Sequence, residues 1–153
     1  MNAEAIIKKL IEKNITIATA ESCTGGMLGK LITSIPGASS IYGFGFITYA
    51  NEAKNRILGV KNETLLSYGA VSEQTALEMA SGALEKSGAD IAVSITGIAG
   101  PGGGTAEKPV GLVYIAIADK KEKEFRRLLL TGDRETIRQK ACEQVLELIN
   151  SKI

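Results

Sequence analysis

The sequence predicts an α/β fold, in which one layered domain has a mixed, mostly parallel sheet covered by helices. Short apolar runs of strand length alternate along the chain with longer segments whose apolar residues recur at helical spacing. Such alternation favours helices packed on the faces of a sheet. A length of 153 residues is typical of one domain, so residues 1–153 are expected to fold as a single unit.

The first half of the chain supplies two predicted strands and three predicted helices. The first is a helix with Ile6, Ile7, Leu10 and Ile11 on one face, followed by a strand at 16–20 and a strand-to-helix turn at 22–26. A helix at 27–34, a break at 35–40, a strand at 44–49 and a short helix at 51–58, with Asn51 as its expected N-cap, come next.

The second half continues the alternation and contains a glycine-rich loop between two strands. The predicted elements are a helix capped near Ser72 and closed by Gly88, a strand at 90–96, the loop at 97–104, a strand at 110–118, a strand at 123–130 and a final helix opened by Asp133.

Composition excludes several classes of function. Lys plus Arg number 18 and Asp plus Glu 17, so no strong field favours nucleic acid or an anionic membrane. Aromatic residues are few, which argues against a surface that stacks bases. No apolar run is long enough to span a bilayer, and the N-terminus reads as an amphipathic helix without a cleavage site. We therefore expect a cytoplasmic protein that binds neither nucleic acid nor membrane.

The absence of histidine restricts the chemistry. Without it the chain has no Ser-His-Asp triad, no HExxH zinc site and no imidazole base. Cys23 and Cys142 are far apart in sequence and form no metal or disulfide framework. Acid–base chemistry must come from Lys, Tyr, Asp, Glu or Cys, and we expect no metal site.

The loop at 97–104 is a candidate ligand site, because five of its eight residues are glycine. Glycine lets main-chain N–H groups approach a bound anion. The loop lacks the Lys-Ser/Thr ending of a Walker A motif and the final glycine of a dinucleotide fingerprint. A long surface turn between two strands is the alternative.

A nucleophile is predicted at the turn after the first strand. Ser22 lies where a strand leads into a helix, with Thr24, Gly25 and Gly26 behind it. Such a turn can supply an attacking hydroxyl and main-chain donors for an oxyanion. The alternative is that Ser22 or Thr24 only caps the helix. Cys23 competes for the same role, although a buried, inert cysteine is the commoner case.

Lys54 is the candidate base. It lies one turn into the helix at 51–58, where the helix dipole disfavours a cation. If Lys54 is desolvated beside Ser22, its neutral amine can take the serine proton. Tyr49, at the end of the preceding strand, is a candidate to orient the lysine or relay the proton. A solvated lysine and a packing tyrosine are the alternatives.

The start of the final helix is a candidate phosphate site. Arg134 and Arg138 lie one turn apart, where main-chain donors also converge. A surface helix capped by Asp133 is the alternative interpretation.

Five blocks of sequence together carry a family resemblance. They are Ala-Glu-Ser-Cys-Thr-Gly-Gly at 20–26, Tyr-Ala-Asn-Glu-Ala-Lys at 49–54, Gly-Ala-Val-Ser at 69–72, the glycine loop from Thr96 with Glu-Lys-Pro-Val-Gly at 107–111, and Gly-Asp-Arg at 132–134. In this order, over nearly the whole chain, they resemble the CinA C-terminal domain family. The family's serine falls on Ser22 and its lysine on Lys54, whereas Ala50 replaces its usual serine.

The resemblance implies a nicotinamide-nucleotide amidohydrolase. Such an enzyme converts nicotinamide mononucleotide to nicotinate mononucleotide and ammonia in pyridine-nucleotide salvage. It implies no cofactor, no metal requirement and, without the extra domain of some relatives, no pyrophosphatase activity. The alternatives are a non-catalytic nucleotide-binding or regulatory module and an amidohydrolase for another small amide. The family's habit and the apolar stretch at 41–47 suggest a homodimer with sites near the interface.

With that resemblance, each candidate residue receives an expected role. Lys54, aided by Tyr49, deprotonates Ser22, and the turn at 24–26 holds the oxyanion. The glycine loop and Arg134 hold ribose and phosphate. The expected catalytic residues are Ser22, Lys54, Tyr49 and Thr24, and the expected substrate-binding residues are Gly25, Gly26, Thr96, Gly97, Gly100, Gly102, Gly103 and Arg134.

Overall fold

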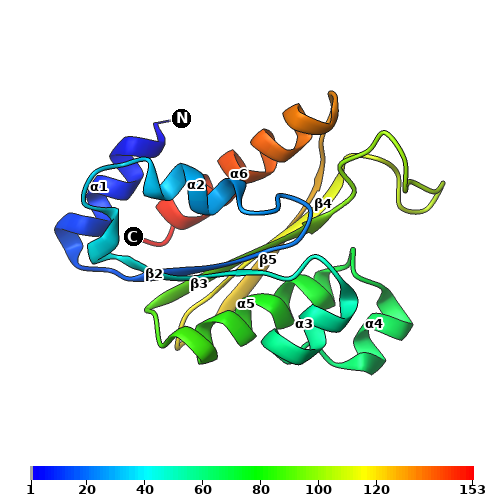
Figure 1. Cartoon of the computed structure of the whole chain (residues 1–153), viewed down its shortest axis with the longest axis horizontal. Coiled ribbons are helices and arrows are strands. Elements are labelled where there is room, and N and C mark those ends of the chain that lie inside the picture. The colour runs from blue at the N-terminus through cyan, green and yellow to red at the C-terminus, as the bar shows by residue number, and fades with distance from the viewer. Residues whose placement is uncertain (1) are drawn as a thin grey trace.

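A five-stranded sheet lies between two layers of helices in the computed structural model, which describes residues 2–153 (Figure 1). The strand order is β2-β1-β3-β4-β5. β1 runs parallel to both of its neighbours, whereas β4 runs antiparallel to both β3 and β5, so the sheet is mixed and the predicted α/β class is confirmed. The strands are β1 (Ile17–Glu21), β2 (Tyr42–Ile47), β3 (Ile91–Gly97), β4 (Leu112–Ala118) and β5 (Lys123–Leu129).

Three helices lie on each side of the sheet (Figure 1). The upper layer in that view contains α1 (Ala3–Lys13), α2 (Met27–Thr33) and α6 (Arg134–Asn150). The lower layer contains α3 (Asn51–Leu58), α4 (Asn62–Tyr68) and α5 (Glu73–Ser87), and a short 3₁₀ turn, Ala38–Ser40, precedes β2. On this lower side α3 and α4 pack on α5, which contacts the strands.

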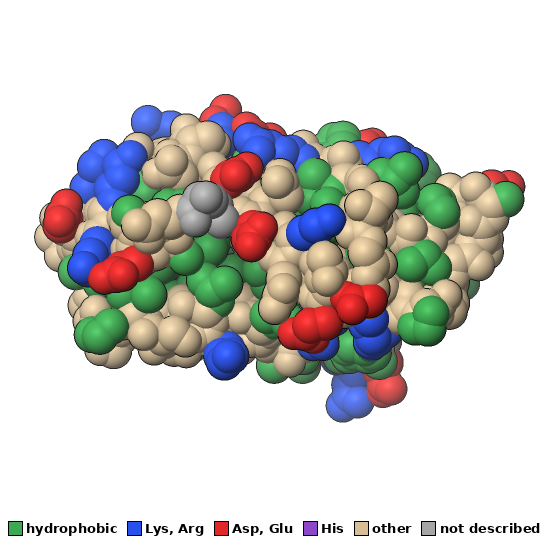
Figure 2. Space-filling view, turned by 90° about the horizontal axis from the view of Figure 1, so that it is seen from above, with side chains coloured by type: hydrophobic (Ala, Val, Ile, Leu, Met, Phe, Trp, Pro, Cys, Tyr) green, Lys and Arg blue, Asp and Glu red, His purple; other side chains and the backbone are tan. Residues whose placement is uncertain are grey.

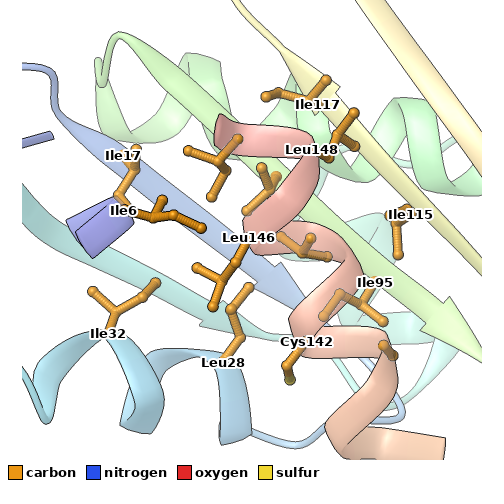
Figure 3. Close-up of a cluster of buried hydrophobic side chains, with 14 of the residues drawn as sticks. Ile6, Ile17, Leu28, Ile32, Ile95, Ile115, Ile117, Cys142, Leu146 and Leu148 are labelled. Atoms are coloured by element: carbon orange, nitrogen blue, oxygen red, sulfur yellow. The ribbon is translucent and has the colours of Figure 1, made fainter. Parts of the chain in front are cut away.

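The two faces of the sheet pack differently. Branched side chains such as Ile17, Ile95 and Leu146 fill the core under α1, α2 and α6 (Figure 3). On the other face the strands and α5 present mainly alanines, which let helix and sheet approach closely. A side chain at Gly82 of α5 would collide with the carbonyl of Leu58, so α3 crosses α5 at this glycine. This crossing holds α3, and with it Lys54, against the sheet.

Most predicted elements are confirmed, with three corrections. Ser72 and Asp133 cap α5 and α6 as expected, and Gly88 closes α5. α3 begins at Asn51, but its N-cap is Ala50, whose side chain makes no capping bond. β2 ends at Ile47, so Tyr49 lies beyond the strand rather than at its end. Helix α4 was not expected.

The topology creates a crevice at the carboxyl ends of β1 and β3. After β1, the chain passes through α2 on one face of the sheet and reaches β2, which lies on one side of β1. It then returns through α3, α4 and α5 on the other face and reaches β3, which lies on the other side of β1. In open α/β sheets, ligands bind where neighbouring connections diverge in this way. Ser22 and the glycine loop follow these two strands directly.

The surface of the upper layer carries both signs of charge. Figure 2 shows Lys and Arg interspersed with Asp and Glu, without a large area of one sign. Within residues 2–153, no helix combines the length and apolarity needed to cross a membrane.

Candidate active site

Ser22 and Lys54 form a buried pair at the head of β1. Lys54 Nζ donates a hydrogen bond to Ser22 Oγ at 2.9 Å, and the lysine is fully buried. The same ammonium nitrogen donates to the carbonyl oxygens of Thr48, at 2.9 Å, and Tyr49, at 3.2 Å. These three acceptors fix the end of a long, otherwise flexible side chain against the serine hydroxyl.

Burial makes the neutral form of Lys54 more accessible than that of an ordinary lysine. Among the described residues, no carboxylate makes an ion pair with it. Burial lowers the pKa of Lys54 to about 8 from the ordinary 10.5. A neutral amine within hydrogen-bond reach of a serine hydroxyl meets the geometric requirement for a general base.

Cys23 is a poor competitor for the nucleophile's role. Burial raises the pKa of its thiol to about 11, so the thiolate is scarce at neutral pH. Cys142 is packed in the upper core, and burial raises its pKa as well. Both cysteines are free, and both are buried.

A cavity of about 270 Å³ opens beside the serine–lysine pair. It brings together nine of the predicted site residues, namely Ser22, Tyr49, Lys54, Thr96, Gly97, Gly100, Gly102, Gly103 and Arg134. Larger hollows of about 430 and 690 Å³ lie elsewhere, and neither contains this pair. Of these three cavities, the one of about 270 Å³ holds Ser22 and the buried Lys54 together, so it is the candidate active site.

Four apolar cavity residues were missed from the sequence. Ala70 and Val71 come from the segment before α5, and Ile98 and Ala99 from the start of the glycine loop. Residues 70 and 71 belong to the block at 69–72 that supports the family resemblance, and this membership was the signal in the sequence that could have placed them in the site. Thr96 is turned toward the same segment, since its hydroxyl donates to the carbonyl of Ala70 at 2.8 Å.

Tyr49 and Arg134 form the polar rim of the cavity. Arg134 donates to the Tyr49 hydroxyl at 3.1 Å and to the carbonyl of Gly100 at 2.8 Å. Tyr49 is 60% exposed, and its backbone carbonyl, rather than its side chain, contacts Lys54. Its hydroxyl is therefore directed to the arginine rather than to the base.

Thr24, Gly25 and Gly26 do not line the cavity. The Thr24 hydroxyl, fully buried, donates to the Glu21 carboxylate at 2.7 Å. The N–H of Gly25 donates to the carbonyl of Ser22 at 3.1 Å, and that of Gly26 to Glu21 at 3.3 Å. The structure thus separates these three residues from the nine that it brings together.

Arg138 does not join Arg134 in a phosphate clamp, which corrects that prediction. Its guanidinium donates to the carbonyls of Cys23, at 3.1 Å, and Thr24, at 2.9 Å, and lies 3.3 Å from the Glu135 carboxylate. These contacts hold the turn after β1 against α6. Separately, within residues 2–153 no three His, Cys, Asp or Glu side chains are grouped so as to hold a metal ion.

The fold and this site define a class of protein: an α/β domain with a buried serine–lysine pair beside a glycine-rich loop at the sheet's crevice. The chain matches the CinA C-terminal domain over residues 1–153 and belongs to the CinA family. Ala50 stands at the N-cap of α3, so the missing family serine costs a helix cap rather than a cavity contact.

Relatives and solved structures agree on this membership. A Clostridium novyi protein described as competence-damage inducible is 52% identical over 98% of this chain and 36% of its own length. The chain thus spans about a third of the curated relatives it matches. The crystal structure of a competence/damage inducible protein from Agrobacterium tumefaciens has a TM-score of 0.95 at 45% identity, covering 97% of this chain and 92% of that one. A CinA superfamily structure from Escherichia coli has a TM-score of 0.94 at 36% identity, with coverage of 99% and 88%.

Proposed function

We propose that this domain is a cytoplasmic amidohydrolase that converts nicotinamide mononucleotide to nicotinate mononucleotide and ammonia. The observation that carries the proposal is the 2.9 Å contact between the Lys54 amine and the Ser22 hydroxyl at the wall of a cavity. A buried lysine without a carboxylate partner costs the fold stability, and titratable groups perturbed in this way are concentrated at functional sites.

The proposed reaction proceeds through an ester of Ser22. Neutral Lys54 takes the hydroxyl proton as Ser22 Oγ attacks the carboxamide carbon, and the tetrahedral oxyanion accepts main-chain N–H bonds at the cavity wall. Lys54 then returns its proton to the departing amide nitrogen, which leaves as ammonia. A water molecule, deprotonated by the same lysine, attacks the ester and releases the carboxylate and the serine hydroxyl.

The lining of the cavity supports a small nucleotide as substrate. Ala70, Val71 and Ile98 offer an apolar wall suited to a planar pyridine ring. Arg134 and the main-chain N–H groups of the glycine loop offer donors suited to a phosphate. Remote contacts of this kind orient the carboxamide carbon against Ser22.

The test is ammonia release from nicotinamide mononucleotide by the purified domain with a chelator present. Nicotinamide riboside, which lacks the phosphate, is the matched control substrate. Release that is insensitive to the chelator and much weaker with the riboside supports the proposal. Folded protein that releases no ammonia from the mononucleotide contradicts it and favours the nucleotide-binding module.

The proposed base predicts a rising pH profile. Burial holds the pKa of Lys54 at about 8, and only the unprotonated amine accepts the serine proton. We expect kcat/KM to rise roughly tenfold per pH unit below that pKa and to level off above it. The measurement is kcat/KM between about pH 6 and 9.5. A flat profile over this range would exclude Lys54 as the base.

We also propose that the domain forms a homodimer through β2. The two edges of the sheet differ, since β5 carries Lys123, Glu124, Arg126 and Arg127 whereas β2 carries no charge. Charged edges resist pairing with another strand, and uncharged ones do not. Phe44 and Ile47 of β2 are 50% and 55% exposed, which suits antiparallel pairing of two copies about a two-fold axis.

Light scattering on the purified domain is expected to give the mass of a dimer. Phe44→Lys introduces a charge at the proposed interface and is expected to give a monomer. Phe125→Lys, at the opposite edge, is the matched control and is expected to remain dimeric. A monomeric wild-type protein, or a dimeric Phe44→Lys variant, contradicts this interface.

A further inference from the structure

Glu21, the last residue of β1, is a buried carboxylate outside the cavity. It is only 1% exposed, and none of the ion pairs among the described residues includes it. Successive side chains of a strand point to opposite faces, so Glu21 faces α2 whereas Ser22 faces α3 and Lys54. Glu21 touches neither the cavity nor the base.

Four donors satisfy this carboxylate. The hydroxyl of Thr24 donates at 2.7 Å, and the N–H groups of Leu28, Gly29 and Gly26 donate at 2.9, 3.1 and 3.3 Å. Gly26, the N-cap of α2, has no side chain to cap the helix, so Glu21 does this from the preceding strand. One carboxylate thus ties both ends of the turn that begins with Ser22.

Arg138 binds the same turn from α6 through the opposite kind of group. Its guanidinium donates hydrogen bonds to the carbonyl oxygens of Cys23 and Thr24, whereas the Glu21 carboxylate accepts hydrogen bonds from N–H and O–H groups. The N–H of Ser22 is fixed in turn on the carbonyl of Ile95 at 3.0 Å. The backbone beside the serine is therefore held from β3, α2 and α6.

We propose that Glu21 and Arg138, with Thr24 as the link to Glu21, are positioning residues that set Ser22 Oγ within proton-transfer distance of Lys54. The proposal rests on the proposed Ser–Lys function. The contact to be held is 2.9 Å long, and proton transfer needs a heavy-atom distance of about 2.6–3.2 Å. A displacement of the turn by about 1 Å breaks it, and misplacement on that scale costs roughly 100-fold in rate.

The chain contains a matched control for this arrangement. Glu78 of α5 accepts hydrogen bonds from the hydroxyl of Thr64 at 2.7 Å and from the N–H of Lys61 at 2.9 Å. It thus holds the start of α4 as Glu21 holds the start of α2, with a brace, a carboxylate that binds a threonine hydroxyl and a backbone N–H. None of Glu78, Thr64 and Lys61 lines the cavity. Glu78→Gln and Thr64→Val therefore report what losing such a brace does to stability alone.

The experiment compares Glu21→Gln, Thr24→Val and Arg138→Met with the two control variants and Thr24→Ser. Three quantities are measured: the melting temperature, kcat and KM for ammonia release, and the rate at which a fluorophosphonate labels Ser22, read by peptide mass. The labelling rate reports the reactivity of the serine without the nucleotide.

Glu21→Gln, Thr24→Val and Arg138→Met are expected to lower both kcat and the labelling rate by about 10- to 100-fold, with KM changed less than about threefold. Thr24→Ser, which restores the donor, is expected to recover most of the rate. The control variants are expected to lose a similar amount of melting temperature with kcat unchanged. If Glu21→Gln does not fold, Thr24→Val decides.

Two results would overturn the proposal. In the first, Thr24→Val matches Thr64→Val in melting temperature, kcat and labelling rate, so that the brace is merely structural. In the second, wild-type protein is not labelled at Ser22, and the nucleophile itself is then wrong. Wild-type protein that is labelled but releases no ammonia shows instead that the proposed substrate is wrong, and the labelling rates still test the brace.

Discussion

Replacing Ser22 by alanine is expected to lower the turnover of nicotinamide mononucleotide by at least about 1,000-fold, because the attacking oxygen is lost. The fold is expected to survive. Ser22 is only 8% exposed and loses a single hydrogen bond, from Lys54, which keeps its two carbonyl acceptors. The loss of one such bond costs about 1 kcal/mol.

Ser94→Ala is the matched control for this prediction. Ser94 is a fully buried serine on neighbouring β3, and its hydroxyl donates to the carbonyl of Ala76 at 2.6 Å without lining the cavity. The measurements are the rate of ammonia release and the melting temperature of both variants. Wild-type turnover in Ser22→Ala would exclude the proposed mechanism, whereas Ser94→Ala is expected to keep its activity.

Replacing Lys54 by methionine is expected to abolish turnover to a similar degree without destabilising the fold. The lowering of the lysine pKa from 10.5 to about 8 corresponds to a cost of about 3 kcal/mol for the buried ammonium at neutral pH. Methionine fills similar space without charge, at the expense of about 1 kcal/mol for each of the two carbonyls left unpaired. The free energy of unfolding is expected to be unchanged or about 1 kcal/mol higher.

The pH dependence of stability gives an independent check. The unfolded lysine keeps its proton up to its ordinary pKa of 10.5, whereas the folded one loses it near 8. The unfolded state thus binds more protons in this window, and wild-type stability rises with pH relative to the methionine variant. Denaturant unfolding at pH 7.5 and about 10 measures this difference. Lys86→Met, at an exposed position of α5, is the control, and a clear loss of stability in Lys54→Met at pH 7.5 contradicts the argument.

Helical and strand periodicity predicted most of the fold because most elements bury one continuous apolar stripe. α1 does so with Ile6, Ile7 and Leu10, and the final helix likewise. α4 escaped detection because it has seven residues and buries only Thr64, so it has no apolar stripe. β2 was predicted to extend to Tyr49 because its apolar residues run on past Ile47, where pairing with β1 ends.

The members of the candidate site were more predictable than their contacts. Ser22, Lys54 and the glycine loop stand out locally by residue type, but the 2.9 Å contact across 32 residues depends on how α3 crosses α5. The hydrogen bond from Thr24 to Glu21 could not be predicted from the sequence, because the Glu21 carboxylate caps a helix that begins several residues later in the chain. Arg138 likewise reaches a turn 114 and 115 residues away.

The cage around Lys54 has a consequence for how this domain diverges. The proposed base and the two carbonyls that hold it all lie within residues 48–54, so one codon change at position 54 would remove the proposed base while the rest of the cavity lining stays in place. Since the buried ammonium costs stability, we expect the lysine to be kept in lineages where the proposed hydrolysis is under selection. Under the proposed function, loss of the lysine at this position in a descendant that keeps the glycine loop would mark the conversion of a hydrolase into a receptor for the same ligand.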